Sequence, residues 1–268
     1  MIILPDSWKK QWQGQDVFDQ LFTIRGDEYR NMDGRRTLRF DMLGRSYFAK
    51  LYRGIGWRRI FKSLLSLRKP PVLSARNEWL AIQKLTDLGV ATMTIVGYGV
   101  RGVSPASKQS FLITQDLQGT ESLEDFCRNW IEQPPDCRLK RALIKKIAQV
   151  SCTLHDNGIN HRDYYLCHFL LDISAGKDNL DPQYLTPYLI DLHRVQFRSS
   201  VPRRWRIKDL AALYFSSMEI GLTQRDFYRF MCEYTQKPLA QIVKDCLWQR
   251  VVVRGVKLQQ RFYRKYAQ

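Results

Sequence analysis

The sequence has no paired-cysteine motif and no long apolar run. None of its six cysteines is spaced as CxxC, and a chain of 268 residues is not a small disulfide scaffold, so we expect reduced thiols. No apolar run approaches the roughly 20 residues that cross a bilayer. The apolar start MIILP is too short for a signal peptide. These absences predict a cytoplasmic protein that touches a membrane only from its surface.

Negative charge is also scarce. The chain has 43 Lys and Arg residues against 26 Asp and Glu residues, which gives a formal net charge of +17. Such an excess favours an anionic partner, namely nucleic acid, a membrane surface or an acidic molecule. The hydrophobic content of 44% and the aromatic content of 12% still suffice for a core in one large domain or two lobes.

The first half of the chain is rich in strand patterns. Residues 28–30, 37–42 and 46–52 have the residue types of a small antiparallel sheet. A helix is expected over 75–88, with Ser74 as its N-cap and Gly89 at its end. The runs TIVGYGV and SFLITQDL predict two further strands. Gln118 and Gly119 then provide a natural hinge.

The second half is mostly helical. Leu139, Leu143, Ile147, Val150 and Leu154 recur at three- and four-residue spacing, which predicts one long helix that ends at Gly158. FLLDIS and YLIDL read as short buried strands, and helices return from residue 208. The expected fold class is α+β with two lobes. Its parts are an N-terminal extension over 1–25, a β-rich N-lobe over 26–117 and a helical C-lobe over 118–268.

Four charged residues stand in unusual surroundings. Asp163 follows His and Arg in HRDYYLCHFLL, where an aspartate either caps a turn or serves as a general base. Asp191 ends the apolar run YLIDLH, where an ionised carboxylate requires a partner such as Mg²⁺. Lys50 in YFAKLY either extends to solvent or binds an anion. Glu78 on the expected helix, taken alone, reads as a surface charge.

The order of these four residues indicates a kinase-like enzyme. Such enzymes use a strand Lys, a helix Glu, a loop Asp and a later Asp in this order. The Lys contacts the nucleotide phosphates and pairs with the Glu, the loop Asp accepts the proton of the acceptor hydroxyl, and the last Asp holds the metal. Five residues after the loop Asp the template has a metal-binding Asn, whereas this chain has His168. Imidazole is a poorer ligand for a hard cation, so His168 either touches a metal or orients a neighbouring carboxylate.

The motifs also resemble those of one family. HRDYYLCHFLL and YLIDLHRVQFR, together with GRSYFAKLYRGIGWR and KDLAALYFSS, are similar to the lipopolysaccharide core heptose kinase family over residues 15–265. The resemblance implies a protein-kinase-like fold and ATP-dependent phosphorylation of the first heptose of the lipopolysaccharide inner core. It implies Mg²⁺, with Mn²⁺ as an alternative, and a lipid A–core acceptor. It also implies nucleotide contacts from Gly34, Gln115 and Leu117.

Departures from protein kinases support a non-protein acceptor. The chain has no GxGxxG loop and no APE stretch, and only the short basic segment 192–208 separates Asp191 from Asp209. This leaves little room for an activation loop and a peptide platform. The cations Arg194, Arg198, Arg203 and Arg204 in this segment suit the carboxylates and phosphates of an anionic glycan. The alternative is a solvated basic face.

A second acid-free basic segment covers 53–77. Helical spacing of its apolar residues predicts an interfacial helix on the anionic cytoplasmic face of the inner membrane. The residues expected to face the membrane are Trp57, Arg58, Arg59, Phe61 and Lys62. The alternative is a helix that packs its apolar stripe on the N-lobe. The overall charge also suits an acidic protein partner.

Two other functions compete with the heptose kinase. One is a kinase of the same fold that acts on another small molecule or on protein tyrosine. The other is a basic nucleic-acid-binding protein without catalytic activity. The second leaves the ordered set of Lys50, Glu78, Asp163 and Asp191 to chance, so we expect no specific nucleic acid partner.

Overall fold

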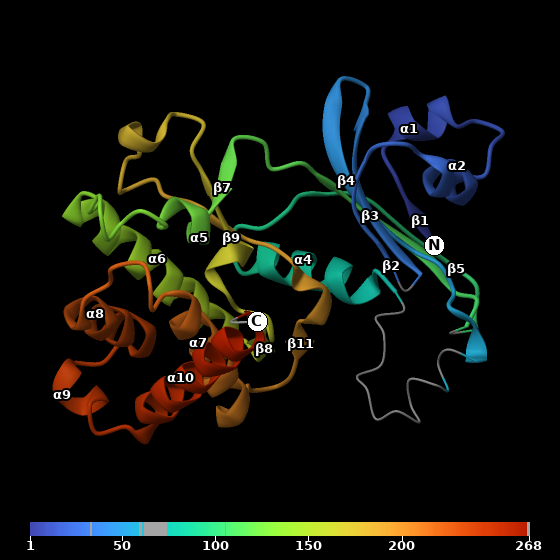
Figure 1. Ribbon diagram of the computed structural model, residues 1–268. Coiled ribbons are helices and arrows are strands. Elements are labelled where there is room, and N and C mark those ends of the chain that lie inside the picture. Colours follow the sequence, from blue (N-terminus) through green and yellow to red (C-terminus); the bar gives the residue numbers. More distant parts are fainter. Residues whose placement is uncertain (33, 59–60, 62–73, 105, 267–268) are drawn as a thin grey trace. The chain divides into compact units, whose positions relative to one another are not determined.

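The structure is a computed structural model that describes residues 1–32, 34–58, 61, 74–104 and 106–266 (Figure 1). The chain forms two compact units. The N-terminal unit comprises Met1–Lys84 and Met93–Leu117, and the C-terminal unit comprises Leu85–Thr92 and Gln118–Gln268. No helix within the described residues is long and apolar enough to cross a membrane.

A six-stranded antiparallel sheet forms the centre of the N-terminal unit, in the strand order β1-β5-β6-β4-β3-β2. The strands are β1 (Ile2–Ile3), β2 (Asp27–Met32), β3 (Arg35–Met42), β4 (Arg45–Tyr52), β5 (Ile95–Arg101) and β6 (Gln109–Gln115). Among the helices of this part of the chain are α1 (Asp6–Gln11), α2 (Val17–Thr23) and α4 (Arg76–Asp87). The expected strands are present with small shifts at their ends.

One face of this sheet is apolar because side chains alternate along each strand. Leu38 and Phe40 from β3 and Ala49 and Leu51 from β4 are buried on it, and the apolar sides of α1 and α2 cover them. Trp8 is only 1% exposed, and its ring lies 5.0 Å from that of Tyr47 in an edge-to-face arrangement. The first 25 residues therefore contribute to the core of this unit.

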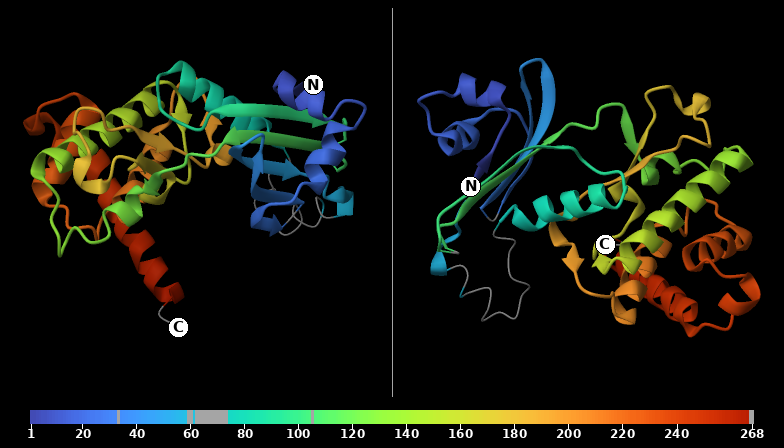
Figure 2. Two further views of the ribbon diagram at one scale, coloured as in Figure 1. Left: turned by 90° about the horizontal axis from the view of Figure 1, so that it is seen from above. Right: turned by 180° about the vertical axis from the view of Figure 1, so that it is seen from behind.

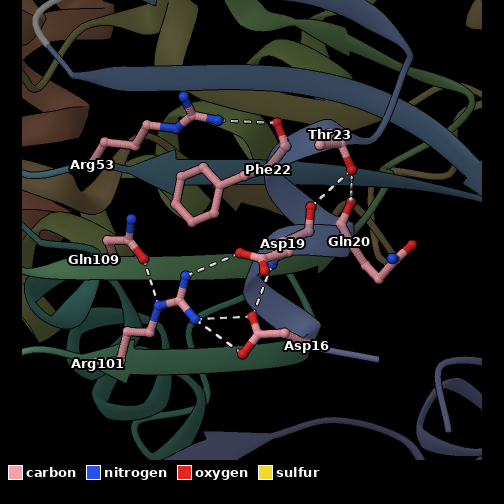
Figure 3. A network of polar contacts seen from close by, with 8 residues as sticks. All are labelled: Asp16, Asp19, Gln20, Phe22, Thr23, Arg53, Arg101 and Gln109. Carbon is pink, nitrogen blue, oxygen red and sulfur yellow. Dashed lines mark hydrogen bonds and ion pairs between the residues drawn. The ribbon is translucent and has the colours of Figure 1, made fainter. Parts of the chain in front are cut away.

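A polar network fixes α2 on this apolar face (Figure 3). Asp16 caps the helix by accepting a hydrogen bond from the backbone amide of Asp19 at 3.0 Å. The guanidinium of Arg101 on β5 binds both carboxylates, at 2.9 Å and 3.2 Å, and lies over the Phe18 ring. Because these ion pairs are exposed to solvent, they set the orientation of α2 more than they stabilise the fold.

The other face of the sheet is polar. Arg35 and Thr37 on β3 pair in register with Tyr52 and Lys50 on β4, so all four side chains leave the sheet on the same side. Helix α4 contributes to this side, because the backbone amide of Ala75 donates to the Ser110 hydroxyl on β6 at 3.0 Å. The sheet thus separates a packed apolar layer from a layer of cations and hydroxyls.

The C-terminal unit is mainly helical. Its α-helices are α5 (Leu123–Phe126), α6 (Cys137–Asp156), α7 (Arg203–Ser216), α8 (Gln224–Thr235), α9 (Leu239–Ile242) and α10 (Cys246–Tyr266). Its short strands are β7 (Thr120–Ser122), β8 (Ile159–Asn160), β9 (Phe169–Asp172), β10 (Pro187–Leu189) and β11 (Gln196–Phe197). The 3₁₀ turns are η1 (Leu166–His168), η2 (Lys177–Asn179) and η3 (Leu192–Arg194). Figure 2 shows the last turns of α10 extending away from the rest of this unit.

Most expected helices are present, with three differences. The long helix α6 and the helix α4 match their predictions, and Gly158 follows α6 with a φ of +72°. Helix α7 begins at Arg203, before the expected start at residue 208, because Pro202 provides a natural first turn. Helices α1 and α2 were not predicted. Asp191 follows strand β10 instead of ending it, and its backbone is left-handed with a φ of +59°.

Candidate active site

The proposed nucleotide side of the site centres on an ion pair. The Lys50 ammonium on β4 lies 2.5 Å from the Glu78 carboxylate on α4. Glu78 is 1% exposed and Lys50 is 15% exposed, so both charges are largely removed from water. When one member of such a buried pair is removed, the other charge stays buried without its counter-charge, which is costly. The structure therefore brings together the strand Lys and the helix Glu that the sequence order singled out.

A tight turn with one glycine joins two strands of the same sheet. Gly34 joins β2 to β3 with a φ of +73°, and a Cβ there would lie 2.5 Å from Ile55 Cγ2 and 2.8 Å from the carbonyl oxygen of Arg53. Only glycine fits this position without strain. The next residue, Arg35, is buried over the Tyr52 ring at 5.6 Å. Its Nε has no hydrogen-bond partner among the residues that the structure describes.

Two predicted nucleotide contacts lie at the end of β6. Gln115 is the last residue of that strand and is exposed, and its backbone amide donates to the Thr94 carbonyl at 2.9 Å. Leu117 is half-buried and is the last residue of the N-terminal unit. Gln115 is thus held by its backbone, while its side chain is accessible.

The HRD loop in the C-terminal unit is held by a buried aspartate from α7. Asp209 is 1% exposed, and its carboxylate accepts hydrogen bonds from the backbone amides of His161 at 2.7 Å and Arg162 at 2.9 Å. These bonds hold Arg162 in a left-handed conformation with a φ of +77°, which is unfavourable for a residue with a side chain. The loop therefore turns sharply at Arg162 and presents Asp163 next.

His161 is completely buried beneath this turn. Its Nε2 lies 3.1 Å from the carbonyl oxygen of Ile190, so it connects the HRD loop to the segment that carries Asp191. Burial lowers the pKa of His161, although the carboxylate of Asp209 partly opposes this shift. His161 is therefore a structural imidazole that stays neutral near pH 7.

Asp163 is contacted by two side chains. One guanidinium nitrogen of Arg194 donates to both carboxylate oxygens of Asp163, each at 2.8 Å. The His168 Nδ1 lies 2.6 Å from the backbone carbonyl oxygen of Asp163. Because a carbonyl only accepts hydrogen bonds, this contact requires the proton of His168 on Nδ1. Asp163 itself remains half-buried, with 21% of its side chain exposed.

Asp191 is connected to the same loop through His168. The His168 Nε2 lies 3.7 Å from one Asp191 oxygen, and the His193 Nδ1 lies 2.5 Å from the other. With its proton on Nδ1, a neutral His168 has an Nε2 lone pair on the side of Asp191. The described residues contain no group of three or more His, Cys, Asp or Glu side chains placed to hold a metal. A single protein carboxylate is enough for Mg²⁺ that arrives with nucleotide phosphates, because Mg²⁺ takes most of its ligands from the substrate and from water.

The four arginines proposed for the acceptor have different surroundings. Arg194 binds Asp163, and Arg203 binds Asp245 at 2.6 Å. Arg198 donates to the side-chain oxygens of two neutral residues, Asn160 and Gln196. Arg204 is exposed, with its guanidinium carbon 5.6 Å from the centre of the Trp205 ring. The structure thus places Arg198 and Arg204 around one indole and gives Arg203 a separate partner.

Part of the proposed membrane segment lies outside the described residues, namely Arg59 and Lys62. Trp57 and Phe61 are 51% and 56% exposed, and their rings lie 5.8 Å apart. Arg58 is also exposed. These three residues therefore present apolar rings and a cation to solvent.

Three residues of this region escaped the sequence reasoning as site residues. Asp209 was noted only within KDLAAL, and nothing local shows that its carboxylate holds a loop 47 residues earlier. Arg35 was noted only as a neighbour of Gly34, because its burial depends on the sheet. Trp205 was counted only among the seven tryptophans. Its position in a run of cations was the available signal.

The chain is similar to proteins of one family. The model of the Lipopolysaccharide kinase (Kdo/WaaP) family matches residues 19–234. An Escherichia coli protein described as lipopolysaccharide core heptose(I) kinase WaaP is 48% identical over 268 residues, covering 99% of each chain. A Pseudomonas aeruginosa PAO1 protein with the same description is 48% identical over 248 residues, covering 91% of this chain and 90% of that protein.

A solved structure extends the likeness to three dimensions. The structure described as WaaP in complex with acyl carrier protein is 42% identical, with a TM-score of 0.81 over 96% of this chain and 99% of that chain. The expected α+β, protein-kinase-like fold class is confirmed. The family model matches most of the chain, and the two relatives are each 48% identical to it. The chain therefore belongs to the lipopolysaccharide kinase (Kdo/WaaP) family.

Proposed function

We propose that this enzyme transfers the terminal phosphate of ATP to a hydroxyl of the first heptose of the lipopolysaccharide inner core. Two relatives at 48% identity are described as heptose(I) kinases, and the coverage of both is nearly complete. The substrate is the lipid A–core glycan in this proposal.

The observation that carries the proposal is the geometry at Asp163. Two backbone hydrogen bonds to the buried Asp209 set the loop, and Arg194 fixes the Asp163 carboxylate from one side. The carboxylate keeps a solvent-accessible side, where an acceptor hydroxyl can donate its proton. Asp163 is therefore assigned as the general base, which takes the proton of the attacking hydroxyl as the new O–P bond forms.

The nucleotide contacts are assigned to residues of the N-terminal unit. Lys50, held by Glu78, binds the phosphates, and the Gly34 turn lets the backbone approach them. Arg35 is added to this set because it is buried beside Lys50 on the polar face of the sheet with an unpaired Nε. Gln115 and Leu117 complete the proposed ATP contacts.

Asp191 is the proposed ligand of Mg²⁺, with Mn²⁺ as an alternative. The metal supplies positive charge to the phosphates when it is bound. His168 orients Asp163 through its backbone carbonyl, and its Nε2 is the second candidate ligand. The proposed acceptor contacts are Arg194, Arg198 and Arg204. Arg203 was expected with them, but Asp245 binds its guanidinium, so we propose it as a surface ion pair outside the acceptor site.

The proposed setting is the cytoplasmic face of the inner membrane, where a peripheral enzyme reaches a lipid-anchored acceptor. The exposed Trp57, Arg58 and Phe61 support an interfacial segment. Arg59 and Lys62 belong to the same proposal from their sequence positions. We also keep as a proposal the division into a 1–25 extension, a 26–117 lobe and a 118–268 lobe.

An acidic protein partner is part of the same proposal. The solved structure of similar fold is described as a complex with acyl carrier protein. A chain with a formal charge of +17 attracts such a partner through long-range electrostatics, which salt screens. Titration with acyl carrier protein at two salt concentrations tests this. A complex that weakens as salt rises supports the proposal, and no complex at low salt contradicts it.

A kinase assay with competing acceptors tests the main proposal. The protein is incubated with ATP and Mg²⁺ and with dephosphorylated core lipopolysaccharide, an aminoglycoside, a tyrosine peptide or RNA. Phosphate transfer to the core glycan alone is expected, with a loss of about 10²- to 10⁴-fold in Asp163→Ala. Nucleotide binding by that variant is the folding control. Transfer only to another small molecule or to tyrosine, or RNA binding without transfer, selects one of the rival functions instead.

A further inference from the structure

Four cations surround a single indole in the C-terminal unit. The Lys208 ammonium lies 3.9 Å from the centroid of the Trp205 ring. The guanidinium carbons of Arg198, Arg162 and Arg204 lie at 5.3, 5.5 and 5.6 Å. These residues come from the HRD loop, from the residue after β11 and from α7, so the fold itself gathers them. We call this group the Trp205 cluster.

The cluster is short of negative partners. The side chains of Arg162 and Arg204 have no hydrogen bond or ion pair among the described residues, and Arg198 binds only the neutral Asn160 and Gln196. A cation over an indole gains about 0.5–2 kcal/mol, but the ring does not cancel its charge. Partial burial and then the cations of Arg194 and Arg198 lower the pKa of Arg162, against the opposing effect of Asp163. The group therefore holds mutually repelling charges at close range.

Other arginines of the same helix have carboxylate partners. Arg203 pairs with Asp245 at 2.6 Å, and Arg206 pairs with Asp156 at 3.2 Å. Arg204 lies between them in sequence and contacts the indole instead. The chain thus pairs Arg203 and Arg206 with carboxylates, whereas the guanidinium groups of Arg162 and Arg204 have no carboxylate partner among the described residues.

The Trp205 cluster also lies beside the proposed general base. Arg162 precedes Asp163. The two hydrogen bonds that the Asp209 carboxylate accepts from the loop amides hold Arg162 in its unfavourable left-handed conformation. This conformation directs the Arg162 guanidinium to Trp205, while Asp163 binds Arg194. An anion held at the cluster would therefore sit next to the carboxylate that deprotonates the acceptor.

We propose that the Trp205 cluster binds an anionic substituent of the glycan acceptor, either a sugar carboxylate or a phosphate monoester, and thereby sets the reacting hydroxyl at Asp163. Guanidinium groups bind both anions through paired hydrogen bonds. The proposal rests on the proposed function, because it names the feature of the acceptor that this enzyme recognises.

The first test compares two neighbouring arginines. Arg204→Gln removes one exposed cation of the cluster, so the fold should not change. A charge-assisted hydrogen bond is worth about 1.5–3 kcal/mol, so KM for the core glycan should rise by roughly 10-fold or more. The KM for ATP should stay the same. Arg203→Gln is the matched control, since that arginine already has Asp245 as its partner, and it should leave the acceptor KM unchanged.

The ring is tested separately. Trp205→Phe keeps an aromatic face and should retain most of the acceptor affinity, whereas Trp205→Leu should lose it to a similar extent as Arg204→Gln. If Trp205→Leu proves unstable, the Arg204→Gln and Arg203→Gln pair still decides. Equal acceptor KM values for Arg204→Gln, Arg203→Gln and the unmodified protein would overturn the proposal.

The source of the anion is found by altering the acceptor. Carboxyl-reduced core glycan and phosphate-free core glycan are each given to the unmodified enzyme and to Arg204→Gln. The modification that removes the bound anion should raise the KM of the unmodified enzyme to that of the variant and leave the variant unaffected. If the variant is further impaired by both modifications, the cluster does not bind the acceptor anion. Calorimetric binding of the glycan requires no turnover, so it separates failure of this site from failure of the proposed reaction.

Discussion

Removing the Glu78 carboxylate should destabilise the N-terminal unit and stop nucleotide binding, and the two effects can be separated. Glu78 is 1% exposed and lies 2.5 Å from a Lys50 ammonium that is 15% exposed. Glu78→Ala leaves that ammonium largely buried without its carboxylate. Breaking a buried pair in this way costs about 3–5 kcal/mol. In a chain of this size each kcal/mol lowers Tm by roughly 2–4 °C, so the expected drop is about 6–20 °C.

An apolar double variant isolates the cost of the unpaired charge. Replacing a buried ion pair by apolar residues of similar volume is often neutral or stabilising. Lys50→Met combined with Glu78→Leu should therefore melt close to the unmodified protein, although neither charge remains. The same double variant should neither bind Mg²⁺–ATP nor transfer phosphate, because Lys50 is the proposed phosphate contact. The pair would then serve nucleotide binding more than stability.

Thermal denaturation and calorimetric titration with nucleotide measure the two effects. The control is Asp87→Ala, which removes an exposed carboxylate from the same helix α4. An exposed charge contributes less than about 1 kcal/mol, so Tm should change by less than about 4 °C. Equal Tm values for Glu78→Ala and Asp87→Ala would refute the energetic reasoning. A double variant that melts as low as Glu78→Ala would show that lost packing, not an unpaired charge, causes the loss. A double variant with ordinary ATP affinity would remove Lys50 from the nucleotide site.

Three further predictions concern single positions. Arg35→Gln should raise KM for ATP by roughly 10-fold in steady-state kinetics. Arg36 lies on the opposite face of the sheet and already pairs with Glu28, so Arg36→Gln should leave this KM unchanged. Equal KM values for the two variants would remove Arg35 from the site. His168→Asn should keep activity in Mg²⁺ if the residue ligates metal, and kinetics that fall as far as in His168→Ala would assign it to orientation alone. Burial raises the pKa of Asp226, but hydrogen bonds from Thr223 and Lys140 outweigh this and lower it below 3.8, so its stabilisation is present above pH 3.8 and is lost as pH falls through the folded pKa. Acid unfolding of Asp226→Asn should accordingly depend less on pH below about 4, and an unchanged acid limb would contradict this.

The sequence was informative where the signal is local. Alternation along β3 and β4 and the three- and four-residue spacing in α6 predicted these elements, because each spacing follows from the geometry of the element itself. The order of Lys50 and Glu78 correctly placed two residues that meet in space. Helices α1 and α2 were missed although Asp16 is followed by a recognisable first turn that it caps.

Contacts between distant segments could not be predicted. The hydrogen bonds that the HRD loop donates to the Asp209 carboxylate depend on how α7 packs beside β8. The left-handed backbone of Arg162 is held by those bonds, since arginine does not prefer it. The bond between Arg194 and Asp163 likewise joins residues 31 positions apart. Only the folded chain shows which of its many arginines are paired and which surround Trp205.

The position of strand β1 at the edge of the sheet has a consequence for how the chain is made. Ile2 and Ile3 pair with Gly99 and Tyr98, and the Met1 carbonyl accepts the amide of Val100. Residues 1–3 therefore wait for partners that are synthesised about 100 residues later, and such long loops close slowly. During that interval the apolar sides of α1 and α2 lack most of their sheet. A chaperone that binds apolar segments can act on these two helices during that interval.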